Sequence, residues 1–241
     1  MCVVIQRVWR RIFKLIRDMR ITELFRRYLV FILGLYFLAA GIVLIIHSAL
    51  GTTPISSVNY VLSLNTALSL GACTFIINML MVVGQFWLIR GHQNRRDIIE
   101  ILLQIPFSFI FSAFIDLNMA LAAELHPSNY GMALAILLVG CFVQSVGVVL
   151  EIKPKVAMMS AEAFVKYASQ RYNKEFGQFK VYFDVTLVTL AVLLSLVFTR
   201  NIEGVREGSL IAACITGYIV TFLNKRVMTR KMLRKLVPVL K

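Results

Sequence analysis

Long apolar stretches, separated by short polar segments, make up most of the chain. Six of them approach or reach the length of about 20 residues that a helix needs to cross the hydrocarbon core of a bilayer. They run over residues 28–49, 71–89, 98 to at least 115, 130–150, 179–198 and 209–223. The pattern predicts an all-α fold, a polytopic membrane helical bundle of about six transmembrane helices.

Two kinds of segment outside these stretches also have helical patterns. In residues 3–20, apolar residues recur at steps of three and four while basic residues mark another face, which predicts an amphipathic helix in the membrane interface. After the first span, Thr53 and Pro54 fit the N-cap and first position of a short helix, and Ser160 opens a similar one. Each short helix either lines a cavity at membrane depth or lies in the interface.

Composition and charge agree with a membrane protein. Of the 241 residues, 59% are hydrophobic and only 16% are charged, whereas soluble domains carry about 25% charged residues. The net charge of +14 is gathered mainly before the first span and after the last. Such flanks are typical of contact with anionic lipid headgroups, and no DNA-reading motif accompanies them, so we expect no nucleic acid as partner.

Loop charges predict the orientation in the membrane. Residues 48–72 carry no charged side chain, and residues 98–150 contain no Lys or Arg. Basic residues instead follow the second span and crowd the loop before the fifth. Because loops rich in Lys and Arg stay in the cytoplasm, we expect both termini to be cytoplasmic.

An internal repeat is visible when the sequence is shifted by 106 residues. The shift places Gly34 on Gly140, Gly41 on Gly147, and Asn78 on Asp184. Since each repeat would hold three spans, the second would enter the membrane from the opposite side, as in many secondary transporters. We therefore predict two inverted three-helix repeats. The chain then divides into an N-terminal interfacial helix (1–27), a first membrane repeat (28–126), a second membrane repeat (127–225) and a basic C-terminal tail (226–241).

The aligned glycines have a predicted packing role. Gly34 and Gly41 are seven residues apart and so lie on one face of a helix, as do Gly140 and Gly147. Small residues on one face allow two helix backbones to approach closely inside a membrane. We expect all four glycines at helix contacts.

Neither an enzyme nor a metal site is expected. The sequence has no known catalytic motif, and its four cysteines and three histidines lack the spacing of metal ligands. We therefore predict no catalytic residue, no metal and no cofactor. An intramembrane enzyme is the third choice of function, because no nucleophile–base pair is recognisable.

Ionisable and polar residues within or beside the spans are the candidate substrate or coupling residues, because charge in hydrocarbon is costly. They are Asp184, Asn78, Lys180, His47 and Glu151. Asp184 lies about two turns into the fifth span, and Lys180, one turn earlier, is placed to pair with it. The pair either carries coupling charge or is structural. Asn78 is expected at a similar depth from the other side.

Several motifs together resemble the YitT/YczE family of bacterial integral membrane proteins, which is largely uncharacterised. They are the first span with Gly51-Thr-Thr-Pro54 after it, Phe176-Gly-Gln-Phe-Lys180 running into Asp184, and Gly204 to Ser209 with Gly217, and they cover roughly residues 28–226. The resemblance implies a bacterial plasma (inner) membrane and a repeated helical fold, but no substrate. Many members have an aromatic and an acidic residue after this proline; Ile55 and Ser56 stand here, so no role for that acid carries over.

Two classes of function remain. The first is a small-solute transporter or permease of unknown substrate, which the predicted repeats and the matched polar residues favour. The alternative is a non-transporting membrane protein that regulates or scaffolds a partner. Expected partners are the bilayer and a small solute; a second copy of the chain or another membrane protein stays open.

Overall fold

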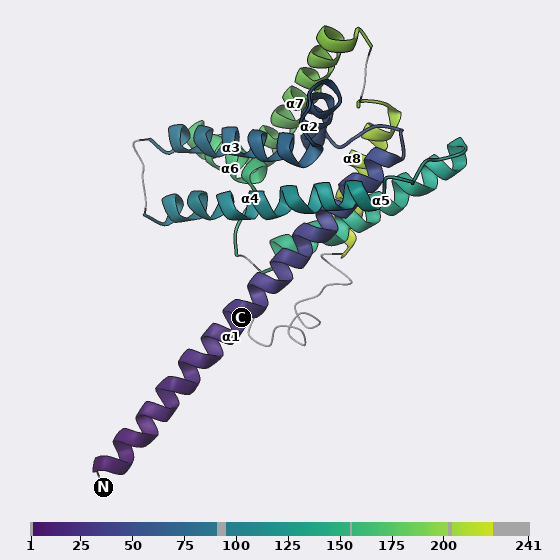
Figure 1. Cartoon of the computed structure of the whole chain (residues 1–241). Helices are drawn as coiled ribbons and strands as arrows, with labels where there is room; N and C mark the ends of the chain where they lie inside the picture. The colour runs from purple at the N-terminus through teal and green to yellow at the C-terminus, as the bar shows by residue number, and fades with distance from the viewer. Residues whose placement is uncertain (1, 91–94, 155, 202–203, 224–241) are drawn as a thin grey trace.

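The computed structural model of the chain is built from helices (Figure 1). It describes residues 2–90, 95–154, 156–201 and 204–223, with side chains from residue 24 onward except at 95 and 96. The helices are α1 (Cys2–His47), α2 (Pro54–Asn65), α3 (Leu70–Leu88), α4 (Arg95–Leu121), α5 (Tyr130–Ile152), α6 (Ser160–Arg171), α7 (Phe176–Thr199) and α8 (Glu207–Phe222). No strand occurs in the described residues, which confirms the all-α fold.

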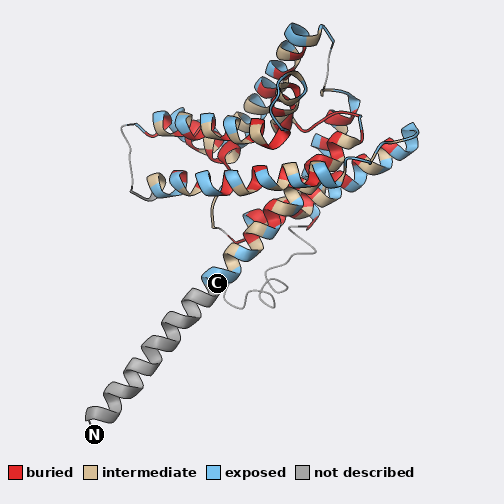
Figure 2. Cartoon of the chain, viewed as in Figure 1, coloured by how far each residue is buried: buried red, intermediate tan, exposed pale blue. Residues whose placement is uncertain are grey.

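Within the described residues, five helices are long and apolar enough to cross a membrane. They are Leu24–His47 within α1, Leu70–Leu88, Asp97–Leu121, Tyr130–Ile152 and Phe176–Thr199. The sixth predicted span corresponds to α8, which is apolar but has only 16 residues in the described part of the chain. Many large apolar side chains on these helices are exposed, as lipid-facing residues are (Figure 2). The chain is a multi-pass integral membrane protein.

The first helix is longer than the predicted first span. Residues 3–20 are helical, but they form the beginning of α1, and no break separates them from the apolar segment. The predicted basic face of this segment lies outside the described side chains. The predicted basic tail, residues 226–241, also lies outside the described residues.

Both predicted short helices are present. Thr53 is the N-cap of α2 and Pro54 its first residue. The Thr53 hydroxyl donates to Ser56 Oγ at 3.0 Å and does not cap the helix backbone. Helices α2 and α6 each have 12 residues, and Pro54 and Ser160, with which they begin, are 106 residues apart. Helices α3 and α7 also begin 106 residues apart, at Leu70 and Phe176.

Helices α1 and α5 form the central contact of the bundle and run antiparallel. Gly41 lies against Gly140, because a Cβ added to Gly140 would stand 3.1 Å from the Gly41 carbonyl oxygen. Gly34 lies in the same way against Gly147, at 3.1 Å. Any larger side chain would force the two backbones apart, so these glycines set the distance between α1 and α5.

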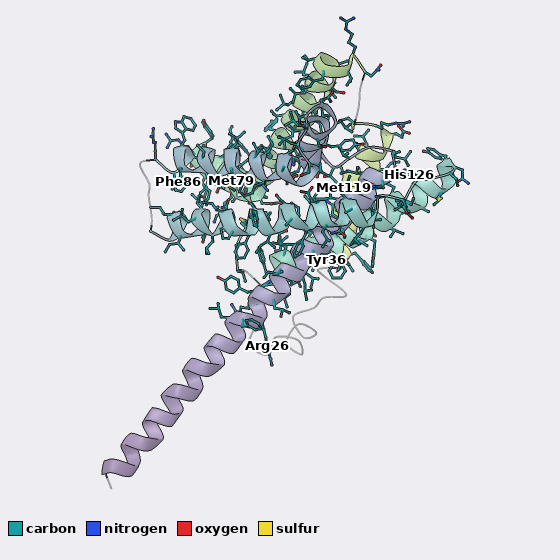
Figure 3. The ribbon with its side chains drawn as sticks, viewed as in Figure 1. Arg26, Tyr36, Met79, Phe86, Met119 and His126 are labelled. Carbon is teal, nitrogen blue, oxygen red and sulfur yellow. The ribbon has the colours of Figure 1, made fainter. Side chains whose placement is uncertain are left out.

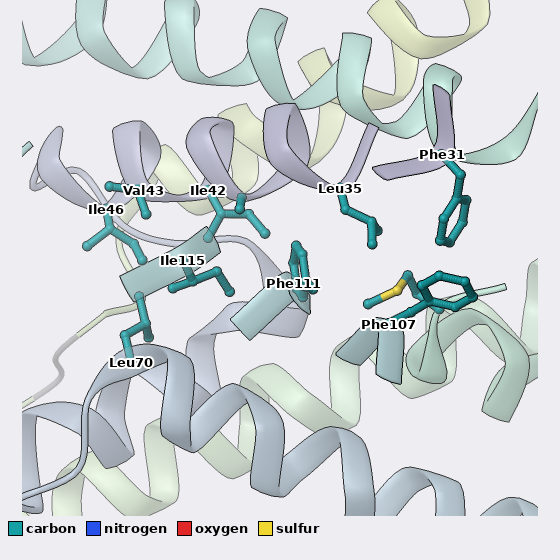
Figure 4. Close-up of a cluster of buried hydrophobic side chains, with 11 residues drawn as sticks. Phe31, Leu35, Ile42, Val43, Ile46, Leu70, Phe107, Phe111 and Ile115 are labelled. Carbon is teal, nitrogen blue, oxygen red and sulfur yellow. The ribbon is translucent and has the colours of Figure 1, made fainter. Parts of the chain in front are cut away.

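The other helices pack around this pair in matched ways. Helix α4 packs against α1 and α8 against α5; α2 packs against α7 and α3 against α6. The cluster between α1 and α4 contains Phe31, Leu35, Phe107 and Phe111 (Figure 4). Two differences break the match among the described residues. Helix α3 packs against α4 and α4 touches α6, whereas the corresponding pairs, α7 with α8 and α8 with α2, have no comparable contact.

Candidate functional site

All eight helices contribute to one cavity of about 260 Å³. Much of its wall is apolar, but charged and polar side chains from α2, α3, α5, α6, α7 and α8 also face it. The first turns of α2 and α6 lie at its edge, with Ser56 and Glu162 among the lining residues. The N-terminal turn of a helix exposes backbone N–H groups and carries partial positive charge. Two such turns therefore meet at the cavity.

An ion pair on α7 lies at one side of the cavity. Lys180 Nζ donates to Asp184 Oδ1 at 2.6 Å, and the two side chains are 25% and 28% exposed. Because the residues are four apart, they share one face of the helix, and both line the cavity. The predicted pairing of these residues is confirmed.

Two further carboxyl groups stand beside this pair. Glu151, in the last turn of α5, is 6% exposed, and its carboxyl group interacts electrostatically with that of Glu162 in the first turn of α6. Among the described residues, neither glutamate has an ion-pair partner within 4.0 Å. Burial raises the pKa of the Glu162 carboxyl above its usual value, against the opposing effect of the Lys180 ammonium.

Uncharged polar side chains also line the cavity. Asn59 Nδ2 donates to Thr74 Oγ1 at 3.2 Å, which ties α2 to α3. Asn78 is 7% exposed, and its Nδ2 has no hydrogen-bond partner in the described structure; the same holds for Oε1 of Gln144 and Oγ1 of Thr216. Buried polar atoms are nearly always hydrogen-bonded to protein, water or ligand. Unpaired donors and acceptors around one cavity are therefore suited to a polar solute.

Six of the lining residues form three pairs whose members are 106 residues apart in the sequence. Ser56, Thr74 and Asn78 correspond to Glu162, Lys180 and Asp184, and all six residues line the cavity. We call these two sets the neutral triplet and the charged triplet. The charged triplet carries ionisable groups at the positions where the neutral triplet has hydroxyl and amide groups. Residues 106 positions apart in the sequence therefore face one space, with different chemistry in the two triplets.

A second buried polar cluster holds the start of α6 in place. Gln85 and Gln104 exchange two hydrogen bonds of 2.9 Å each, and Gln85 Nε2 also donates to the Ser160 carbonyl oxygen at 3.1 Å. The hydroxyls of Ser108 and Ser160 lie 3.1 Å apart. Helices α3 and α4 therefore fix the turn that carries Glu162.

Four of the five predicted candidates line the cavity: Asp184, Asn78, Lys180 and Glu151. His47 does not, because its Nδ1 lies 2.9 Å from the Val43 carbonyl oxygen of the same helix. His126 lies by the α4–α5 connection (Figure 3). In the part of the chain that the structure describes, no three His, Cys, Asp or Glu side chains gather as a metal ion would require.

Sequence reasoning missed several lining residues. Glu162 was not among the candidates, and an acidic residue in the first turn of a helix is ordinarily explained by the helix dipole. Ser56, which lies 106 residues before Glu162, has no charge that would have marked it as a candidate. Gln144 could have been found, because a buried amide inside an apolar span is costly unless it has a partner.

Comparisons with other proteins identify the family but no activity. No curated protein and no solved structure matches the chain. A protein-family model matches residues 25–225, which run from the start of the first apolar segment to just beyond α8. The match therefore includes every residue that lines the cavity. The chain belongs to DUF6198, a family of unknown function.

Proposed function

We propose that this protein is a small-solute transporter and not an enzyme, and that its solute binds in the cavity between two inverted repeats. One observation carries the proposal: the neutral and charged triplets, at equivalent positions in the two halves, line the same cavity. Secondary transporters built from inverted repeats bind their substrates at the interface of the repeats, near the midplane of the bilayer.

The arrangement of helices supports two inverted repeats. Each half consists of a long helix, a 12-residue helix and two further helices, in the same order. Helix contacts occur in matched pairs: α1 with α4 and α5 with α8 within the halves, and α2 with α7 and α6 with α3 across them. Because α1 and α5 occupy equivalent places and run antiparallel, the halves have opposite orientation in the membrane.

Two features suit the alternating exposure of a central site. The α1–α5 contact consists of glycines on both helices, so its smooth surfaces allow one half to rock against the other. Short helices α2 and α6 begin at the cavity, which resembles the broken helices that build transporter sites. Rocking about α1 and α5 would then open the cavity first to one side and then to the other.

We further propose that the protein lies in a bacterial plasma membrane with both termini in the cytoplasm. The excess of Lys and Arg in the two flanks and in alternate loops supports this orientation. Resemblance of the 28–226 segment to the YitT/YczE family supports the bacterial location, and we propose that DUF6198 and that family are related.

A solute screen in proteoliposomes tests the proposed function. Purified protein would be reconstituted and uptake measured for mixtures of small anions, cations and zwitterions, with Asp184→Asn as the inactive variant. Glu124→Gln is the matched control, because Glu124 is exposed and does not line the cavity. Uptake that needs Asp184 but not Glu124 supports transport. Absence of uptake for every class, together with a stoichiometric membrane partner in a gentle-detergent pulldown, would favour the regulatory or scaffolding alternative.

A further inference from the structure

The charges around the cavity do not balance. Three carboxyl groups, Glu151, Glu162 and Asp184, and one ammonium group, Lys180, line it, and no other charged side chain does so in the described part of the chain. Lys180 is bound to Asp184 at 2.6 Å. The lining therefore has two more carboxyl groups than ammonium groups, in a largely apolar site.

The nearby basic residues that the structure describes, Lys166 and Lys153, are not placed to supply the missing charge. Lys166 is bound to Glu100 at 3.1 Å. Lys153 follows Glu151 by two residues, and residues at that spacing do not face each other on a helix. A buried carboxylate without a counter-charge is strongly disfavoured, and two adjacent ones more so. We therefore expect Glu151 and Glu162 to hold protons when the cavity is empty, or to share it with a positively charged solute.

The rest of the cavity restricts what that solute is. Its wall includes Leu38, Ile42, Ile77, Met81, Phe111 and Val148, which favour an apolar body. In the described residues, no cluster of three metal-ligating side chains occurs, and Lys180 stands among the carboxyl groups, so the site does not suit a divalent metal ion. The unpaired amide atoms of Asn78 and Gln144 leave room for one or two polar contacts.

We propose that the cavity takes a small organic cation with an apolar body, and that this cation displaces protons from Glu151 and Glu162. The inference rests on the proposed function and specifies its substrate class. A monovalent cation replaces one proton and a divalent cation replaces two, so the charge of the site is unchanged. Each proton leaves to the side from which the cation came. The same site would then return protonated, which makes the transporter a cation–proton exchanger.

Equilibrium binding to the purified full chain tests the inference without requiring transport. Probes are tetraethylammonium and benzyltrimethylammonium, with benzenesulfonate as an anion of similar size. Titration calorimetry would be done at about pH 6 and about pH 8, in two buffers with different ionisation enthalpies. Since displacement of one proton changes an affinity by up to about tenfold per pH unit, we expect at least about tenfold tighter binding of a cation at the higher pH. Proton release should accompany binding, and benzenesulfonate should not bind.

Neutral variants assign the protons to their residues. Glu151→Gln and Glu162→Gln keep the shape of the protonated side chain, so folded protein should be retained, as judged by a monodisperse elution profile. Each is expected to weaken cation binding at about pH 8 by about tenfold or more and to reduce proton release. Glu124→Gln should change neither. Glu151→Asp, which keeps the charge, should retain part of the pH dependence.

Several results would overturn the inference: no binding of either cation at either pH, binding that does not depend on pH, or unchanged proton release in both glutamine variants. Its failure is distinguishable from failure of the proposed function. Uptake of some other solute without cation binding would remove the substrate class and leave the transporter standing. Cation binding with proton release but without uptake would establish the site and remove the transporter.

Discussion

Gly41 of α1 and Gly140 of α5 face each other so closely that a Cβ on Gly140 would lie 3.1 Å from the Gly41 carbonyl oxygen. The offset of 106 residues turns this contact into the contact of Gly147 with Gly34. One pair of antiparallel helices therefore makes the same glycine contact twice, once on each side of its centre. This repetition is what a two-fold relation between the halves requires.

Replacing Gly41 with a larger residue should destabilise the bundle. In Gly41→Val, the new side chain would meet the backbone of Gln144, so the α1–α5 contact must open. Overpacking of this kind typically costs about 1–3 kcal/mol, and we expect a lower midpoint of thermal unfolding in detergent. The control is Gly177→Ala, because a Cβ at Gly177 meets nothing within 4 Å. An unchanged midpoint for Gly41→Val would show that the two helices are not held at this distance.

Replacing Asp184 and replacing Lys180 should have different effects on stability and transport. In Asp184→Asn, Lys180 keeps a counter-charge because it also acts on the Glu162 carboxyl group. Folded protein should therefore be retained, while transport is lost because the released Lys180 occupies the acidic site. In Lys180→Gln, Asp184 loses its ion-pair partner and Glu162 loses a nearby ammonium group, which we expect to lower the free energy of unfolding by about 1–3 kcal/mol.

The double variant Lys180→Gln with Asp184→Asn should recover the stability that the lysine variant loses, because a buried charge is most harmful when unpaired. Unfolding midpoints and proteoliposome uptake, measured on all three variants, check both expectations. Wild-type uptake by Asp184→Asn would contradict the role of Asp184 in transport. Loss of folded protein in that variant would make the pair structural.

The sequence was sufficient to predict the helices and much of the site. Apolar runs and caps predicted the spans and both short helices, because membrane burial imposes a long and simple pattern. The offset paired Asn78 with Asp184 before any geometry was known, and both line the cavity. Position within a span was enough to name Lys180 and Glu151 as candidates, since an ionisable residue in a span usually has a function.

Other features depend on rotation and packing that a sequence does not display. His47 stands at the end of an apolar run, as Glu151 does, but its ring turns back to the Val43 carbonyl and away from the cavity. Glu162 reaches the cavity because the hydrogen bonds of Gln85 with Gln104 and Ser160 hold the first turn of α6 there. These partners are up to 75 residues apart, and no local pattern connects them.

Topology can be checked independently of function. Reporter tags at Met1 and at Lys241 should both indicate the cytoplasm, because the basic flanks are retained on that side. A cysteine at Ser128, in the exposed connection between α4 and α5, should react with an impermeant reagent added outside. An external C-terminus would rule out the arrangement with six spans.

The most direct measurement of the central claim is the accessibility of Ser56, which lies in the neutral triplet and lines the cavity. Ser56→Cys, in a background without the four native cysteines, would be treated with a small impermeant thiol reagent in right-side-out and in inside-out vesicles. Phe109→Cys is the lipid-facing control, since Phe109 is 65% exposed near the middle of α4. If the cavity opens alternately to each side, Ser56→Cys reacts in both preparations and Phe109→Cys in neither. Reaction from one side only, with and without a cationic solute, would contradict the account.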